Sequence, residues 1–383
     1  MLFRGKLRKI IFVTCLLMLG YASLSLMASL FEDLSIDGVI LEKQTTNTVP
    51  SALHTFLPTV CANESCRRHY EDHMSASGTL PIPKIRHILW RNEFISDYFA
   101  QQVKSWQRIH PDWTYVLWRD QDLEPFVAAN FPELLDKFRS LELKIMRIDM
   151  IRYMLLLKLG GVYADLDYKL VRSLDEFRRF YAVVTREPET HSLQLFGPHW
   201  PIRPAASPAF LMSAPGHIFF RFVLKQLSKR KISEDILAFA GPEGLTITLE
   251  QYQIRYPLTN NPLAGVYVPP SFSFYPYENN SLDGVSKHFK DYRILKLGKS
   301  CSKLARWIDP RMYFLRKVKN LTQLCSDMTK FNAVTDSSPP VYAIHDMRKS
   351  GTSWGITHTP EYFANLTEMA KIVKNFRLGG SLL

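Results

Sequence analysis

The stretch 142–170 constrains the fold more than any other part of this sequence. Apolar side chains lie almost all round the helix that the pattern predicts over 142–159, so this helix must be covered on every side. Gly160 and Gly161 then end it, as glycines past a helix terminus commonly do. The apolar run "VYADLDYKL" (162–170) follows at once and predicts a strand. A buried helix that leads straight into an apolar strand indicates a layered domain of helices and sheet.

The same alternation continues on both sides of this stretch. The pattern predicts a strand over 82–90, a helix over 96–111 that stops at Pro111, and a second strand over 114–120. Strand, helix, strand is a parallel unit with a right-handed crossover. Further elements are predicted at helix 121–138, strand 181–186, helices 217–229 and 244–257, and strand 341–345. The sequence therefore predicts an α/β domain with a mainly parallel sheet.

The N-terminus predicts a membrane anchor. A basic tail (1–9) precedes an uncharged apolar run (10–31), and about 20 such residues suffice to cross a bilayer core. Positive charge before the span holds the tail in the cytoplasm, as in a single-pass type II protein. The alternative is a cleaved signal peptide, whose apolar core is usually about 7–15 residues long. Residues 32–80 lack apolar periodicity and predict a lumenal stem, and 81–383 predict the folded domain.

Cysteines and sequons agree with a lumenal location. Four cysteines follow the anchor, and an even number in an oxidising compartment suggests two disulfides. Of the three possible pairings we expect the local one, Cys61–Cys66 and Cys301–Cys325; free buried thiols are the alternative. Four N-x-S/T sequons fit a secretory-pathway protein and lie at Asn63, Asn279, Asn320 and Asn365.

The net charge of +12 on 383 residues favours acidic partners such as phosphorylated small molecules, anionic lipid or nucleic acid. The basic residues are spread along the chain, with no zinc-finger spacing and no arginine-rich block interleaved with aromatic residues. We therefore do not expect nucleic acid as a partner.

Asp165 and Asp167 are the first candidate site residues. In a strand they would point to the same face, about 6.6 Å apart. Two partly buried carboxylates repel one another, and a hard divalent cation such as Mn²⁺ or Mg²⁺ relieves that repulsion. The alternative is a pair of salt-bridged or turn aspartates, because D-x-D also arises by chance.

Asp149 and Arg152 form a second candidate pair. They lie three residues apart on the predicted buried helix and so share one face. A charged pair on an apolar helix is costly unless its members are paired or bound to a ligand. The pair is either a structural ion pair or a site for the hydroxyl groups of a sugar.

Taken together, several stretches resemble glycosyltransferase family 32. The ordered run D-x-x-R-Y (149–153) followed by G-G-x-Y-x-D-x-D (160–167) is more specific than D-x-D alone. The matching stretches are "IPKIRHILW" (82–90), "HPDWTYVLWRD" (110–120), "RIDMIRYMLLLKLGGVYADLDYKLVRSLDEF" (147–177) and "APGH" (214–217). The resemblance implies a GT-A fold and a retaining, metal-dependent transfer of a hexose from a nucleotide sugar.

The resemblance also implies roles for single residues. Asp165 and Asp167 would bind Mn²⁺ (or Mg²⁺) and the donor diphosphate, and Arg152 would act with them in catalysis by neutralising charge on the leaving group. Asp149 and Arg152 would hold hydroxyl groups of the donor sugar. Trp90, at the end of the first predicted strand, would stack on the nucleobase, with a core or rim aromatic as the alternative.

The resemblance to the family is weaker in the C-terminal part of the chain. His345 would approach the metal or the diphosphate, although a core histidine is the alternative. Trp354, with Ser353, looks like the C-terminal "SW" element of the family and would close over the donor. Relatives often carry a tryptophan soon after this histidine and an asparagine shortly before "APGH", and this sequence has neither. His87 is expected to pack around the nucleotide.

"GGVYADLD" and "APGH" look closest to the mannosyltransferase branch, with its inositol phosphoceramide mannosyltransferases and the fungal initiating α-1,6-mannosyltransferase. That similarity implies GDP-mannose as donor and a glycolipid or glycan as acceptor, at the Golgi membrane. Galactosyl, glucosyl or N-acetylglucosaminyl transfer from a UDP-sugar is the alternative of the same fold. A metal-dependent phosphohydrolase of nucleotide sugars and a lumenal sugar-binding protein without catalysis are alternatives of other classes.

Overall fold

The computed structural model describes residues 57–63, 67–68, 80–188, 192, 204–233, 235–259, 264–276, 340–345 and 365–382. All of them belong to one compact unit, Phe56–Leu383, and a second unit, Met1–Thr55, lies outside them. The predicted tail, the predicted anchor and most of the predicted stem are therefore outside the described residues. Within the described ranges, no helix combines the length and the apolar character that a membrane span requires.

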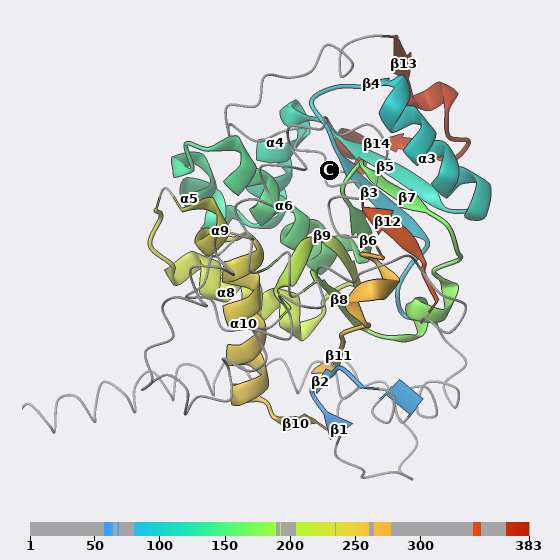
Figure 1. The fold of residues 1–383 in the computed structure, drawn as a ribbon. Coiled ribbons are helices and arrows are strands. Elements are labelled where there is room, and N and C mark those ends of the chain that lie inside the picture. Colours follow the sequence, from blue (N-terminus) through green and yellow to red (C-terminus); the bar gives the residue numbers. More distant parts are fainter. Residues whose placement is uncertain are drawn as a thin grey trace, which may run out of the picture. The chain divides into compact units, whose positions relative to one another are not determined.

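An eight-stranded, mainly parallel sheet forms the centre of the described unit (Figure 1). Its strand order is β14-β5-β3-β6-β9-β8-β11-β2, and among these strands only β9 runs antiparallel to its neighbours. The strands are β2 (Val60–Cys61), β3 (Ile85–Leu89), β5 (Thr114–Trp118), β6 (Gly161–Ala164), β8 (Ala182–Arg186), β9 (Ala206–Ser213), β11 (Val266–Tyr267) and β14 (Phe376–Leu378). The α/β class with a mainly parallel sheet is confirmed.

Three antiparallel strand pairs flank the main sheet. They are β1 (Leu57–Pro58) with β10 (Leu258–Thr259), β4 (Phe94–Ser96) with β13 (Leu366–Glu368), and β7 (Tyr168–Leu170) with β12 (Ala343–His345). The predicted strand at 341–345 is thus present.

Part of the predicted stem belongs to the folded domain. Residues 57–61 form β1 and β2, and β2 pairs with β11 at the edge of the main sheet. Two residues are too short a strand to produce a periodic pattern, so the sequence of 32–80 gave no sign of it. Cys61 is disulfide-bonded, as expected for a lumenal domain, and its partner lies outside the described residues. Asn63 and Asn365, the two sequon asparagines in the described ranges, are exposed.

Helices cover both faces of the sheet, and each face has its own apolar core (Figure 1). Helix α3 (Asp97–Ile109) packs on one face through Phe99, Val103 and Trp106. The other face is covered by α4 (Asp120–Asn130), α5 (Leu135–Ser140), α6 (Lys144–Leu159), α8 (Ile218–Lys229), α9 (Ile236–Phe239) and α10 (Pro242–Arg255). Short 3₁₀ turns lie at Pro132–Leu134, Asp175–Arg179, Ser271–Ser273, Met369–Lys371 and Gly379–Leu382.

The predicted helix over 121–138 is two helices. Helix α4 ends at Asn130, and a 3₁₀ turn that begins at Pro132 leads into α5. Proline disfavours the helical conformation of the residue before it, here Phe131, and has no N–H to continue a helical hydrogen-bond pattern. The buried helix predicted over 142–159 is confirmed as α6, which is buried along most of its length.

The predicted strand over 162–170 is wrong in one respect, because a turn interrupts it. Strand β6 ends at Ala164 and β7 begins at Tyr168. The Asp165 N–H donates to the Ala209 carbonyl of β9 (3.0 Å), and the Tyr168 N–H donates to the Asp165 carbonyl (3.2 Å) and closes the turn. Asp165 and Asp167 therefore lie in a turn at the carboxyl end of β6, and the alternation of a strand does not set their directions.

The two glycines before β6 are required by their backbone and by the neighbouring strand. Gly160 and Gly161 have φ angles of +65° and +93°, which side-chain-bearing residues rarely adopt. A Cβ atom on Gly161 would lie 2.6 Å from the Ile85 carbonyl oxygen of β3. The glycines thus end α6 and also let β6 pair closely with β3.

Three buried histidines are held neutral by hydrogen bonds that they accept. His87 accepts from the Trp118 indole N–H (3.1 Å), His110 from the Leu174 N–H (3.1 Å), and His217 from the Phe219 N–H (3.1 Å). Burial lowers the pKa of His87 and His110 to about 4, and that of His217 to about 3. A proton on the accepting nitrogen would break this hydrogen bond. Protonation of each histidine therefore destabilises the folded state.

This arrangement predicts a pH-dependent difference between the unmodified chain and His217→Asn. Asparagine keeps an acceptor at the N-cap of α8 but does not titrate. An unfolded histidine binds a proton near pH 6.5 and the folded His217 only near pH 3, so stability falls as pH decreases through this window. Between pH 7.5 and 5.5 the unmodified chain should lose about 1.4 kcal/mol relative to the variant. Urea unfolding at both pH values measures this, and parallel curves would contradict it.

Candidate metal and sugar-nucleotide site

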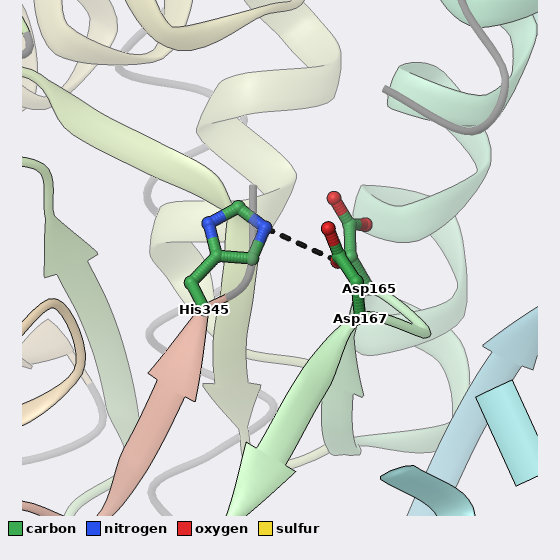
Figure 2. Close-up of side chains that lie close together, drawn as sticks. All are labelled: Asp165, Asp167 and His345. Atoms are coloured by element: carbon green, nitrogen blue, oxygen red, sulfur yellow. Dashed lines mark ion pairs between the residues drawn. The ribbon is translucent and has the colours of Figure 1, made fainter. Parts of the chain in front are cut away.

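Three potential metal ligands converge at the carboxyl end of β6. Donor atoms of Asp165, Asp167 and His345 all lie within 4.8 Å of one another (Figure 2). Strand pairing brings them together, because β12 places His345 opposite Tyr168, the residue directly after Asp167. The His345 Nε2 atom lies 3.2 Å from Asp167 Oδ1, and the Tyr168 ring stacks on the imidazole with centroids 4.3 Å apart.

The electrostatics of this cluster favour a bound cation. Burial raises the pKa of Asp165; the neighbouring Asp167 carboxylate raises it further, whereas Arg152 opposes the rise. Burial alone would lower the pKa of His345, but Asp167 and the other carboxylates outweigh it and raise this pKa. A divalent ion bound between the two carboxylates and the imidazole would neutralise both carboxylates.

The donor atoms fit a divalent cation. Two carboxylates supply the hard oxygen ligands that Mn²⁺ and Mg²⁺ bind, and the imidazole adds a nitrogen. Three protein ligands would leave further coordination positions of such an ion to ligand oxygens or water. The three residues lie together as expected from the sequence: the turn after β6 carries the two aspartates, and the pairing of β12 with β7 places His345 beside them.

Asp149 and Arg152 form a buried ion pair on α6. The Arg152 Nη2 atom lies 2.7 Å from Asp149 Oδ1, and Nη1 donates to the Pro208 carbonyl (2.8 Å). The two side chains are only 6% and 3% exposed. Burial raises the pKa of Asp149 to about 6, with Arg152 opposing the rise.

Tyr163 connects this pair to the metal-ligand cluster. Its hydroxyl donates to Asp165 Oδ1 (2.5 Å), and the Arg152 guanidinium carbon lies 4.8 Å from the centre of its ring. The structural ion pair and the sugar-binding pair considered from the sequence are compatible, because the ion pair is formed beside the cluster while Arg152 Nε has no hydrogen-bond partner among the described residues.

The other predicted site residues have different outcomes. Trp90 follows β3 at the same edge of the sheet and is partly exposed; its indole N–H donates to the Phe94 carbonyl (2.9 Å). The ring packs edge-on against Phe99, at a centroid distance of 5.1 Å. His87 is fully buried between Trp118 and the Gly160 carbonyl, which makes it a core residue. Trp354 and Ser353 lie outside the described residues.

Sequence reasoning missed Glu187 at this site. It directly follows β8 and is 7% exposed, and burial raises its pKa to about 7 while His345 opposes the rise. Strands β6 and β8 both run antiparallel to β9, so their carboxyl ends meet at one edge of the sheet. A signal existed, because a glutamate directly follows the predicted strand 181–186. Without the strand order, nothing linked it to Asp165.

The protein is a mainly parallel α/β domain with a D-x-D turn at the carboxyl edge of its sheet. Proteins of this class bind ligands at the carboxyl ends of their strands, and here that edge carries a candidate cation site. Residues 96–184 match the family model "Glycosyltransferase sugar-binding region containing DXD motif". The match contains Asp149, Arg152, Asp165 and Asp167.

The curated relatives are fungal. The "Mannosyl phosphorylinositol ceramide synthase CSH1" of Saccharomyces cerevisiae is 29% identical over 211 residues, which cover 54% of this chain and 52% of that protein. The "Inositol phosphoceramide mannosyltransferase 3" of Schizosaccharomyces pombe is 36% identical over 117 residues, covering 30% and 33%. The chain thus spans about half the length of the first of these relatives and a third of the second.

Among solved structures, "PaToxG Glycosyltransferase" is similar at 15% identity and a TM-score of 0.32, over 48% of this chain and 78% of that one. This TM-score is too low to support a statement about the fold.

Proposed function

We propose that this chain is a retaining, metal-dependent glycosyltransferase of the GT-A fold. It moves a hexose, mannose from GDP-mannose, to a glycolipid or glycan acceptor. The observation that carries the proposal is the convergence of Asp165, Asp167 and His345 beside the Asp149–Arg152 pair. The family match over the same segment supports sugar transfer, and the similarity to the fungal mannosyl-transferring relatives supports mannose.

The proposed roles follow from the chemistry of each group. Asp165, Asp167 and His345 hold Mn²⁺ or Mg²⁺, and the mixed oxygen and nitrogen donors favour Mn²⁺. A bound ion supplies positive charge to a departing diphosphate. Asp149 and Arg152 orient hydroxyl groups of the donor sugar, and Arg152 adds positive charge next to the cluster. Trp90 stacks on the nucleobase, where such contacts contribute about 1–3 kcal/mol. Trp354 closes over the donor.

The proposed location is the Golgi membrane. Residues 10–31 anchor the chain with the tail 1–9 in the cytoplasm, and the stem and the catalytic domain (81–383) lie in the lumen. The exposed sequon asparagines Asn63 and Asn365 and the disulfide at Cys61 suit this compartment. The membrane then also presents a glycolipid acceptor.

The test is a donor panel with the purified full-length chain and Mn²⁺. GDP-mannose, UDP-galactose, UDP-glucose and UDP-N-acetylglucosamine are each incubated with glycolipid and glycan acceptors, and with none. We expect transfer from GDP-mannose that EDTA abolishes and Mn²⁺ restores, with the anomeric configuration retained by NMR. Transfer from a UDP-sugar would overturn the donor assignment. Equal nucleotide release with and without acceptor would indicate a phosphohydrolase.

A further inference from the structure

A polar group made of Glu187, Ser207 and Tyr275 lies beside the metal-ligand cluster. The Ser207 hydroxyl donates to Glu187 Oε1 (3.3 Å) and also hydrogen-bonds to the Tyr275 hydroxyl. All three side chains are buried. They come from three separate segments: the end of β8, strand β9 and the stretch that follows β11. The hydrogen bonds between these segments hold the carboxyl group of Glu187 and the hydroxyl groups of Ser207 and Tyr275 in fixed directions.

Tyr275 joins this group to His345. Its ring meets the imidazole edge-on with centroids 5.4 Å apart, and it meets Tyr168 in the same manner at 6.0 Å. The Glu187 backbone is held as well, because its N–H donates to the Ala205 carbonyl (2.8 Å). The Glu187 carboxylate interacts electrostatically with both His345 and Asp165. It is therefore a fixed third carboxylate next to the two that would hold the metal.

The carboxyl group of Glu187 restricts what it can contact. It offers oxygen acceptors and no positive charge, so it is unsuited to the diphosphate of a nucleotide sugar. It accepts hydrogen bonds well from hydroxyl groups. The ligand chemistry that suits a buried carboxylate at this position is a neutral polyhydroxyl ring.

We infer that Glu187 binds a carbohydrate hydroxyl group next to the metal-ligand cluster, held in position by Ser207 and Tyr275. This inference rests on the proposed transferase function and adds a sugar-binding residue to it. The hydroxyl can belong to the donor hexose or to the acceptor, and the two sources have separate kinetic signatures.

The test is Glu187→Gln in the full-length chain, since glutamine has the same size and still accepts from Ser207. We expect the KM for one carbohydrate substrate to rise about 10- to 100-fold. If the acceptor supplies the hydroxyl, the acceptor KM rises and donor hydrolysis without acceptor is unchanged. If the donor supplies it, the donor KM rises and that hydrolysis slows. GDP lacks the transferred hexose, so the affinity for GDP with Mn²⁺ should change less than about twofold.

Two further variants keep the inference testable. Glu187→Asp retains the charge but shortens its reach, and it should raise the same KM even if Glu187→Gln unfolds. Glu124→Gln, an exposed carboxylate on α4, is the matched control and should leave all parameters unchanged. Unchanged KM values in both Glu187 variants would overturn this inference, and so would weaker GDP–Mn²⁺ binding in place of a KM effect. Neither result would affect the proposed function. Absence of any transfer by the unmodified chain would overturn the proposed function itself, and this inference with it.

Discussion

Asp167→Asn should lower metal-dependent transfer by at least about 100-fold while leaving the domain folded. Replacing a residue that merely supports a metal ligand typically costs about 10–100-fold in affinity or activity, so loss of a ligand should cost no less. The amide cannot neutralise the ion, and its oxygen is a weaker ligand than a carboxylate. Transfer rates and the Mn²⁺ affinity, measured by titration calorimetry, check this result.

The same variant has a second expected signature, in stability. Asp167 repels the buried carboxylate of Asp165 and contributes to its raised pKa. Removing that charge relieves the repulsion but also takes the ion-pair partner from His345, so the stability of the metal-free protein should change little. Added Mn²⁺ should raise the unfolding temperature of the unmodified chain, through binding to the folded state, but not that of the variant. A catalytic loss that arose from misfolding would instead lower stability in both conditions.

Asp136→Asn is the matched control, because this exposed aspartate on α5 loses the same charge far from the proposed site chemistry. It should keep full activity and full Mn²⁺ affinity. If Asp167→Asn were as active as this control, the metal assignment at β6 would be wrong.

The parts of the fold that the sequence predicted are those with long, uninterrupted patterns. Helix α6 and its glycine end were predicted because a long, mostly apolar run precedes two glycines. Strand β9 was missed, although it is buried throughout, because "ASPAFLMS" mixes serine and proline into a short apolar run. The reversal of β9 relative to β6 and β8 depends on tertiary pairing, which no local pattern reports.

The candidate site was predictable to the extent that its residues are neighbours in sequence. Asp149 and Arg152 share a helix face, and their ion pair follows from that spacing. His345 is 178 residues from Asp167, and only the pairing of β12 with β7 brings them together; the resemblance to a family suggested it and the residues did not. Glu187, Ser207 and Tyr275 gave no usable pattern because each comes from a different segment.

Arg152→Met should destabilise the domain by about 3–5 kcal/mol at pH 8, because it leaves the buried carboxylate of Asp149 without its partner. Lys158→Met, an exposed change on the same helix, is the control and should cost less than about 0.5 kcal/mol. The double variant Asp149→Asn, Arg152→Met should recover much of the loss, since the uncompensated charge is gone. Urea unfolding of the unmodified chain, of Asp149→Asn and Arg152→Met singly, and of the double variant gives the interaction energy of the pair.

The pH dependence of this loss identifies its cause. In the unmodified chain the pKa of Asp149 is already raised to about 6 by burial, against the effect of Arg152. Without Arg152 that pKa rises further, whereas in the unfolded chain it stays near about 3.9. The folded variant therefore binds a proton that the unfolded chain does not, and its stability increases as pH falls from 8 to 5. A stability deficit that stays constant over this range would show that Arg152 acts through its packing and its bond to Pro208, and that the charge of Asp149 is not the source of the loss.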